Sequence, residues 1–282
     1  MRNESNLNKI ASWILAFICS LVLVMALALS VIKFTLFSPS YMQHIADKVN
    51  YSQVMASEIN ETIMDLGRGS SVPPKVLKKT VTVKMVKQDF KNYVDAIYNG
   101  PSFKVANQTL VANEVVKKVK NYAAQINQTL DNEMLTNIDA LGKEAGKRYA
   151  EIVTIPYLLV YAQKVMAFDS QLKLFLVGLF GIFILLLLGG ISLASRLQHR
   201  KLRYVSTVFN GSGLMLLVFP GYLYFSKVFY RLGIGSKPLY DFLTTYVNDF
   251  ILRFLWLGVL CLLIGIILFV LSEQKRKKLI HG

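Results

Sequence analysis

The stretch IASWILAFICSLVLVMALALSVI, residues Ile10–Ile32, and the polar segment that follows it indicate the fold class. The stretch exceeds the roughly 20 apolar residues that a helix needs to cross a hydrocarbon core of about 30 Å. Residues 38–170 are mostly polar, and three more apolar runs follow them, at Leu172–Ala194, Val205–Phe225 and Ile251–Leu271. The sequence therefore predicts an all-α membrane protein with four transmembrane helices and a helical extracytoplasmic domain between the first two.

The charge of the chain indicates how these helices are oriented. The net charge is +15, although only 17% of the residues are charged. Basic residues near the ends of spans mark the cytoplasmic side. Here they are Arg2, Lys9, Arg196, Arg200, Lys201, Arg203, Lys275, Arg276, Lys277 and Lys278. We therefore expect both termini and segment 195–204 in the cytoplasm, and the insert and Lys227–Asp249 outside. Orientation and attraction to anionic lipid account for the charge, so a nucleic-acid partner is not expected.

The chain divides by composition into four parts. Residues 1–37 are a cytoplasmic lead with the first span, residues 38–170 the polar domain, residues 171–272 the other three spans, and residues 273–282 a basic tail. Ala26-Leu-Ala28 matches a signal-peptidase pattern, but the apolar run continues to Phe37, so we expect this segment to stay as an anchor. Cys19 and Cys261 both lie in spans, which leaves the polar domain without a disulfide and favours a bacterial surface.

Helical periodicity organises the polar domain. Asn50 and Gln53 have the spacing of a capping box at a helix start, and Gly67 is expected to end that helix, with a loop to Pro74. Thr80–Val83 is the one candidate strand, and Pro156 interrupts the last helix. The expected helices are Met42–Val49, Met55–Leu66, Val83–Ile97, Leu110–Ile126 and Leu130–Ile155.

Two features near the membrane leave alternatives open. Tyr157–Tyr161 and Val165–Phe168 are apolar and aromatic, and are expected either at the outer lipid interface or buried against the polar domain. The third span carries Asn210 and Ser212 among glycines. Polar side chains at that depth need partners, so contact with another helix is expected, and a substrate path is the alternative.

The residues that catalysis or metal binding would require are not grouped in the sequence. His44, His199 and His281 have no metal-ligand spacing and no cysteine near them. Gly67-Arg-Gly-Ser-Ser71 lacks the Lys-Ser/Thr of a phosphate-binding loop. The centres of the spans hold no Asp or Glu for a proton relay. No catalytic residue, metal or cofactor is therefore predicted.

Short motifs carry a resemblance to one group of proteins. They are Asn50-Tyr-Ser52, Val76-Leu-x(2)-Thr80, Asp89-x(3)-Tyr93 and Ala96-Ile-Tyr-Asn-Gly100. With the spans, they resemble uncharacterised four-span membrane proteins of Gram-positive bacteria, mainly over residues 10–100, and this group brings no known activity. The order of one span, an external domain and three spans is similar to permease-like proteins that partner a cytoplasmic ATPase, including the cell-division type. That similarity is one of topology alone.

Three functions are compatible with these observations. The first is a non-catalytic membrane protein whose external domain binds or senses a cell-envelope partner. The second is a permease-like subunit that couples a cytoplasmic ATPase, through segment 195–204, to the external domain. The third is a membrane enzyme acting on lipid or wall precursors, which would need converging polar groups at the outer membrane face.

Overall fold

The computed structural model describes residues 2–100, 103–155, 158–193, 197–231 and 233–281, and the regular secondary structure in these ranges is entirely helical. The chain forms two compact units. The apolar unit comprises Met1–Phe37, Phe168–Gly233 and Thr244–Gly282, and the polar unit comprises Ser38–Ala167 and Ile234–Leu243. The second part of the polar unit was not indicated by the sequence.

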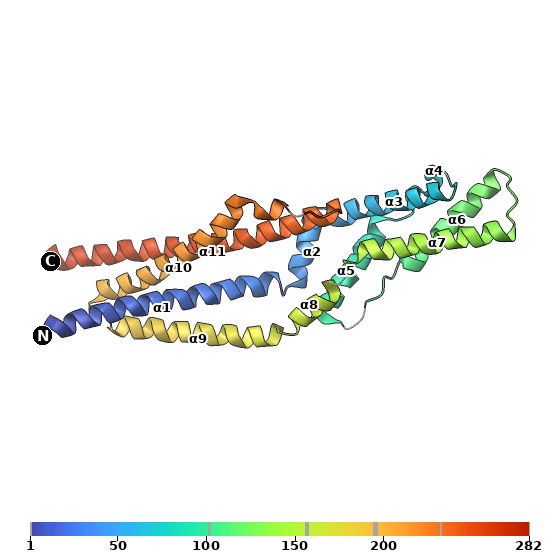
Figure 1. Ribbon diagram of the computed structural model, residues 1–282. Helices are drawn as coiled ribbons and strands as arrows, with labels where there is room; N and C mark the ends of the chain where they lie inside the picture. Colours follow the sequence, from blue (N-terminus) through green and yellow to red (C-terminus); the bar gives the residue numbers. More distant parts are fainter. Residues whose placement is uncertain (1, 101–102, 156–157, 194–196, 232, 282) are drawn as a thin grey trace. The chain divides into compact units, whose positions relative to one another are not determined.

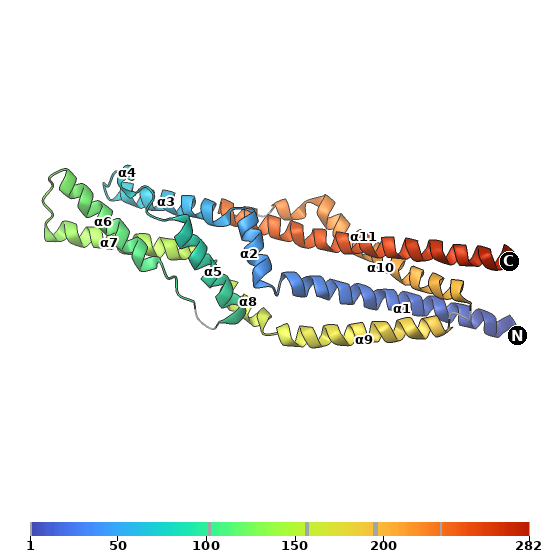
Figure 2. The same ribbon diagram turned by 180° about the vertical axis from the view of Figure 1, so that it is seen from behind.

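Four long helices make up the apolar unit. They are α1 (Arg2–Thr35), α9 (Asp169–Leu193), α10 (Gln198–Ser226) and the part of α11 (Lys237–His281) that follows Leu243, and a short 3-10 helix, η1 (Val228–Arg231), follows α10. Each of the four is long and apolar enough to cross a membrane. In this unit α1 runs beside α9, and α10 beside α11 (Figures 1 and 2). The predicted all-helical fold with four candidate spans is thus confirmed.

The apolar unit has a small buried core and an apolar outer surface. The core joins α1, α9 and α10 through Ala16, Cys19, Leu23, Phe183, Tyr204 and Val208. Outside it, Trp13, Leu185 and Phe225 are 67%, 71% and 80% exposed. Large apolar side chains exposed in such numbers suit a hydrocarbon surrounding and would be unfavourable in water.

Seven helices form the main part of the polar unit (Figure 1). They are α2 (Pro39–Lys48), α3 (Tyr51–Gly69), α4 (Pro74–Leu77), α5 (Val83–Asn99), α6 (Gln108–Gln125), α7 (Asn132–Val153) and α8 (Leu158–Met166). Their buried side chains recur at helical spacing, as Val86, Phe90, Tyr93 and Ile97 do on α5. Such an apolar stripe turns each helix toward a common core.

Polar side chains cap several of these helices. Ser38, Thr82 and Asp131 accept hydrogen bonds from the backbone N–H groups three residues later, at the starts of α2, α5 and α7. The predicted capping box at Asn50 and Gln53 is wrong. Asn50 adopts a left-handed conformation (φ 51°) and makes no side-chain cap hydrogen bond, because the turn from α2 into α3 requires that backbone geometry.

Two other local predictions need correction, and one falls outside the described residues. α3 continues past Gly67 to Gly69. Thr80–Val83 is not a strand, because the Asn60 amide hydrogen-bonds both the N–H and the carbonyl of Val81 at 2.9 Å. A side chain thereby takes the place of a neighbouring strand. Pro156, the expected interruption, lies outside the described residues.

The α6–α7 pair is held together by a close backbone approach. A Cβ atom at Gly142 would lie 2.8 Å from the carbonyl oxygen of Ala112, and one at Gly146 would lie 2.8 Å from that of Gln108. Side chains larger than hydrogen do not fit at these two positions of α7. No pattern in the sequence had indicated a role for these glycines.

Candidate functional site

A buried carboxylate lies at the centre of the polar unit. Asp89 is 0% exposed and sits on the apolar stripe of α5. Its Oδ1 accepts a hydrogen bond from the N–H of Ala106 at 2.9 Å. Its Oδ2 accepts from the N–H and the side-chain amide of Asn107, both at 3.1 Å, and from the hydroxyl of Tyr149 at 2.7 Å. Donors from two other segments of the polar unit therefore converge on one buried carboxylate.

The donors around Asp89 define its role. Ala106 and Asn107 belong to the turn that precedes α6, and Tyr149 belongs to α7. Burial raises the pKa of Tyr149, and its hydrogen bond to Asp89 raises it further. Because donors of the protein occupy both oxygens, Asp89 connects α5 to the start of α6 and to α7. This arrangement fits a structural connection better than a reacting group.

An aromatic cluster joins the start of α11 to the polar unit. Tyr51, Phe90 and Phe242 are 1%, 4% and 2% exposed. The ring centroids of Tyr51 lie 4.8 Å from Phe90 and 5.3 Å from Phe242, and those of Phe90 and Phe242 are 6.1 Å apart. These tilted and edge-on pairs are favourable beyond simple burial. Next to the cluster, the Ser236 hydroxyl donates to Glu58 at 3.1 Å.

The hydroxyl of Tyr51 is an exception to this packing. It is buried and has no hydrogen-bond partner among the described residues. Burial raises the pKa of Tyr51, and the charge of Glu58 adds to the shift. A buried hydroxyl without a partner destabilises the folded state.

Lysines gather where α4 meets α6. The ammonium of Lys118 on α6 donates to the carbonyl of Lys78 at 2.9 Å and to the hydroxyl of Thr80 at 3.3 Å. Lys75, Lys78 and Lys79 are exposed, and within the described ranges no acidic side chain forms an ion pair with them. Partial burial lowers the pKa of Lys118, while Glu114 opposes that shift. We call Lys75, Lys78, Lys79 and Lys118 the basic patch.

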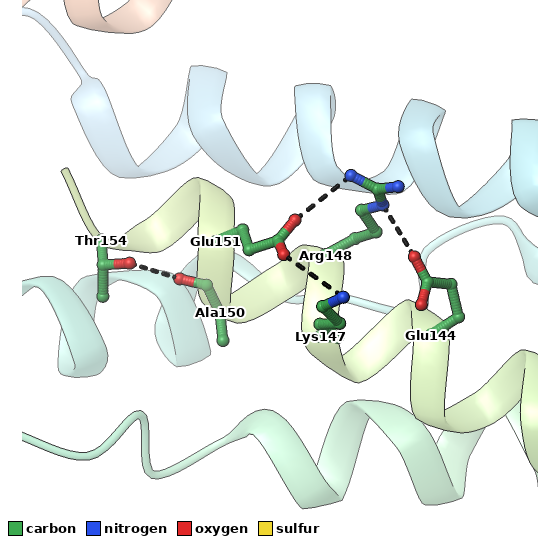
Figure 3. Close-up of polar contacts among 6 residues, drawn as sticks. All are labelled: Glu144, Lys147, Arg148, Ala150, Glu151 and Thr154. Carbon is green, nitrogen blue, oxygen red and sulfur yellow. Dashed lines mark hydrogen bonds and ion pairs between the residues drawn. The ribbon is translucent and has the colours of Figure 1, made fainter. Parts of the chain in front are cut away.

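The charges of α7 are arranged differently. Arg148 pairs with Glu144 at 2.9 Å and with Glu151 at 3.2 Å, and Lys147 lies 3.9 Å from Glu151 (Figure 3). These exposed pairs neutralise each other within one helix, and each is expected to contribute little to stability. Of these two surfaces, the basic patch is therefore the one that carries unpaired positive charge.

The two polar residues predicted to contact another helix lie on different sides of α10. Asn210 faces α11, in a contact that we call the polar seam, and Ser212 faces α1. Asn210 is half-buried and donates to the Ser206 hydroxyl at 3.2 Å, and Ser206 donates to the carbonyl of Gly265 on α11 at 2.8 Å. Ser212 is 0% exposed and donates to the carbonyl of Ser20 on α1 at 3.1 Å. The Ser20 hydroxyl donates back to the carbonyl of Val208 at 3.1 Å.

Glycines allow these helices to approach. A Cβ at Gly213 on α10 would lie 2.8 Å from the carbonyl oxygen of Gly258 on α11, and one at Gly211 would lie 3.0 Å from the Ser20 hydroxyl. The polar side chains of α10 therefore meet backbone carbonyls of α1 and α11 directly. Small residues commonly permit such contacts between membrane helices.

The basic residues predicted to orient the chain lie at two helix ends. Lys275 donates to the side chain of Gln198 at 2.7 Å, and the Ser272 hydroxyl donates to the carbonyl of His199 at 2.6 Å. The start of α10, with Arg200, Lys201 and Arg203, thus lies against the end of α11, with Lys275, Arg276, Lys277 and Lys278. Arg203 also packs over the ring of Phe269, 5.8 Å from its centroid. Arg196 lies outside the described residues.

The residues that organise the polar unit were not among those predicted from the sequence. Asp89 stands among Val86, Phe90 and Tyr93 on one helical face, and a carboxylate inside an apolar stripe is a signal that could have been used. Phe242 gave no comparable signal, since it precedes an apolar run in which aromatic residues are common. In the ranges that the structure describes, no three His, Cys, Asp or Glu residues come together as a metal site would require. Comparisons with protein-family models, curated proteins and solved structures found no match.

Proposed function

We propose that this chain is a non-catalytic integral membrane protein whose polar unit lies outside the cytoplasm and binds or senses a partner in the cell envelope. The orientation is supported by the contact between the start of α10 and the end of α11, which gathers seven basic residues at one end of two neighbouring candidate spans. Such a concentration is typical of the cytoplasmic side. Reporter fusions after Gly100 should then be external, and fusions at Gln198 cytoplasmic.

The observation that carries the proposal is that α11 contributes residues to both units. This helix is continuous from Lys237 to His281, yet its residues up to Leu243 belong to the polar unit and the rest to the apolar unit. A domain that is merely tethered needs only a linker. Here Phe242 instead fills part of the polar unit's own core. A partner that alters the packing around Tyr51 and Phe90 would therefore act on a candidate membrane span.

The basic patch is the surface that best suits a binding partner. Lys75, Lys78 and Lys79 are its exposed members, and exposed lysines outside ion pairs attract an acidic surface and raise the rate of encounter with it. We therefore place the partner contact at Lys75, Lys78 and Lys79, and we infer that the partner presents an acidic segment.

Photo-crosslinking in intact cells tests this function. A photoreactive residue at Lys79 should give a discrete adduct, and the reversal Lys78→Glu should abolish it. The same residue at Lys147 is the matched control, because Lys147 is exposed but paired with Glu151. Adducts of equal yield at both positions would indicate random collision and contradict the proposal.

A second candidate is a permease-like subunit that couples a cytoplasmic ATPase to the polar unit. The continuity of α11 favours it, since a helix shared by both units can transmit movement in either direction. Crosslinking from Arg200 to a nucleotide-binding protein, without any adduct at Lys79, would place this function ahead of the first.

A further inference from the structure

Several apolar side chains of α8 are turned outward, which is unusual for a helix in a folded domain. None of its residues is buried. Val160, Tyr161 and Val165 are 56%, 65% and 42% exposed, and Lys164 is exposed beside them. These positions are one, three and four residues apart, so they share one face of the helix.

The opposite side of α8 is fixed to the polar unit. The amide of Gln163 donates to the carbonyl of Ala96 at 3.1 Å and also to that of Gly100, at the end of α5. The Tyr93 hydroxyl donates to the carbonyl of Ile155 at 2.9 Å, just before α8. These contacts select which face of α8 remains outward.

The chain itself places α8 close to a membrane surface. Only Ala167 and Phe168 separate α8 from α9. The three residue steps from Met166 to Asp169 span at most about 11 Å even when the chain is extended. At the start of α9, Asp169 pairs with Lys173 at 2.8 Å and also with Lys33 near the end of α1. Charged groups on two neighbouring spans mark the level at which hydrocarbon gives way to headgroups.

We propose that the outward face of α8 lies in the lipid interface of the membrane that α9 crosses. Tyr161 and Lys164 suit this position, with the Lys164 ammonium 5.9 Å from the Tyr161 ring centroid. A tyrosine ring and a lysine stem place apolar atoms in the acyl boundary and polar atoms among headgroups. The polar unit is then held at the membrane by α8 in addition to its covalent connections. This inference rests on α9 being a membrane span.

Spin labelling of the whole protein in vesicles of phosphatidylcholine and phosphatidylglycerol tests the inference. Cys19 and Cys261 are first replaced by alanine, and single labels are placed at Val160→Cys and Val165→Cys. Both labels should collide more with dissolved oxygen than with a water-soluble nickel complex, as labels in lipid do. A label at a water-exposed position instead collides more with the nickel complex than with oxygen. Lys147→Cys on α7 is the matched water-exposed control.

A label at Leu185→Cys, on the exposed surface of α9, separates the two claims. A water-like signal there would overturn the membrane span itself. A lipid-like signal at residue 185 with a nickel-accessible signal at residues 160 and 165 would overturn only the interfacial position of α8. Shielding of residues 160 and 165 from both reagents would also overturn it, since a protein surface would then cover the face.

Discussion

The hydroxyl of Tyr149 on α7 donates a 2.7 Å hydrogen bond to Asp89 on α5, and both side chains are 0% exposed. The same carboxylate accepts the backbone N–H groups of Ala106 and Asn107. One side chain thus satisfies donors from two other segments of the polar unit, and each donor depends on it for a partner.

Replacing Asp89 with alanine should destabilise the polar unit strongly. Each buried donor left without a partner costs about 1–3 kcal/mol. The N–H groups of Ala106 and Asn107 and the Tyr149 hydroxyl would lose theirs, while the side-chain amide of Asn107 keeps the Met85 carbonyl at 3.4 Å. Hydrogen exchange of the whole protein in detergent should show faster exchange at Ala106 and Asn107. The control is Asp139→Ala, because Asp139 is exposed and its ion pair with Lys120, at 3.8 Å, is long and expected to be weak. Unchanged exchange at Ala106 in Asp89→Ala would contradict this account.

Removing the hydroxyl of Tyr51 should have the opposite effect to removing that of Tyr149. Tyr51→Phe eliminates a buried hydroxyl without a described partner and should leave the free energy of unfolding unchanged or raise it by up to about 1–3 kcal/mol. Tyr149→Phe removes a donor from a carboxylate and should lower stability by about 1.5–3 kcal/mol. Equal losses in both variants would show that Tyr51 has a partner in the folded protein.

Replacing glycine with alanine should lower stability at glycines in helix contacts and not at glycines on open surfaces. Gly213→Ala places a Cβ 2.8 Å from the Gly258 carbonyl and should destabilise the detergent-solubilised protein by about 1–3 kcal/mol. Gly181→Ala on α9 meets nothing within 4 Å and should be neutral or slightly stabilising. Thermal denaturation of the two variants checks this, and equal midpoints would argue against the close approach of α10 and α11.

Asn210 tests whether the polar seam is a packing contact or a water-filled path. Asn210→Leu removes the hydrogen bond to Ser206 and should lower stability by about 0.6–2 kcal/mol while leaving membrane insertion intact. Asn210→Cys should react slowly with a membrane-impermeant thiol reagent, because the side chain lies between Ser206 and Gly265. Rapid modification would instead favour a path for a solute.

Alkaline pH should destabilise the polar unit through its buried tyrosines. Burial raises the pKa of Tyr93 and of Tyr98 from 10.0 to about 12. Because the folded-state pKa is raised, the stability from the neutral phenols is complete below pH 10 and is lost as the pH rises toward 12. A spectroscopic titration should show a late tyrosinate step in the folded protein, reduced in Tyr93→Phe. If all tyrosines of the folded protein ionised in a single step near their usual pKa, before unfolding, the prediction would be contradicted.

The helices and the candidate spans could be predicted from the sequence, because both depend on local patterns. The run Ile10–Ile32 needs no partner to be recognised as apolar, and the spacing of Val86, Phe90, Tyr93 and Ile97 defines a helical face without reference to other segments. The capping box at Asn50 failed because the turn between α2 and α3 sets that residue's backbone, and spacing alone does not contain that information.

Which helix faces meet became visible only in the folded chain. Asp89 obtains its donors from residues 17 to 60 positions away, and Phe242 reaches Tyr51 from the far end of the chain. The seam from Asn210 through Ser206 to Gly265 likewise depends on how closely two backbones approach. Periodicity states that a face will be buried, but the choice of its partner follows from the joint packing of distant segments, in which shape and hydrogen bonding must be satisfied together.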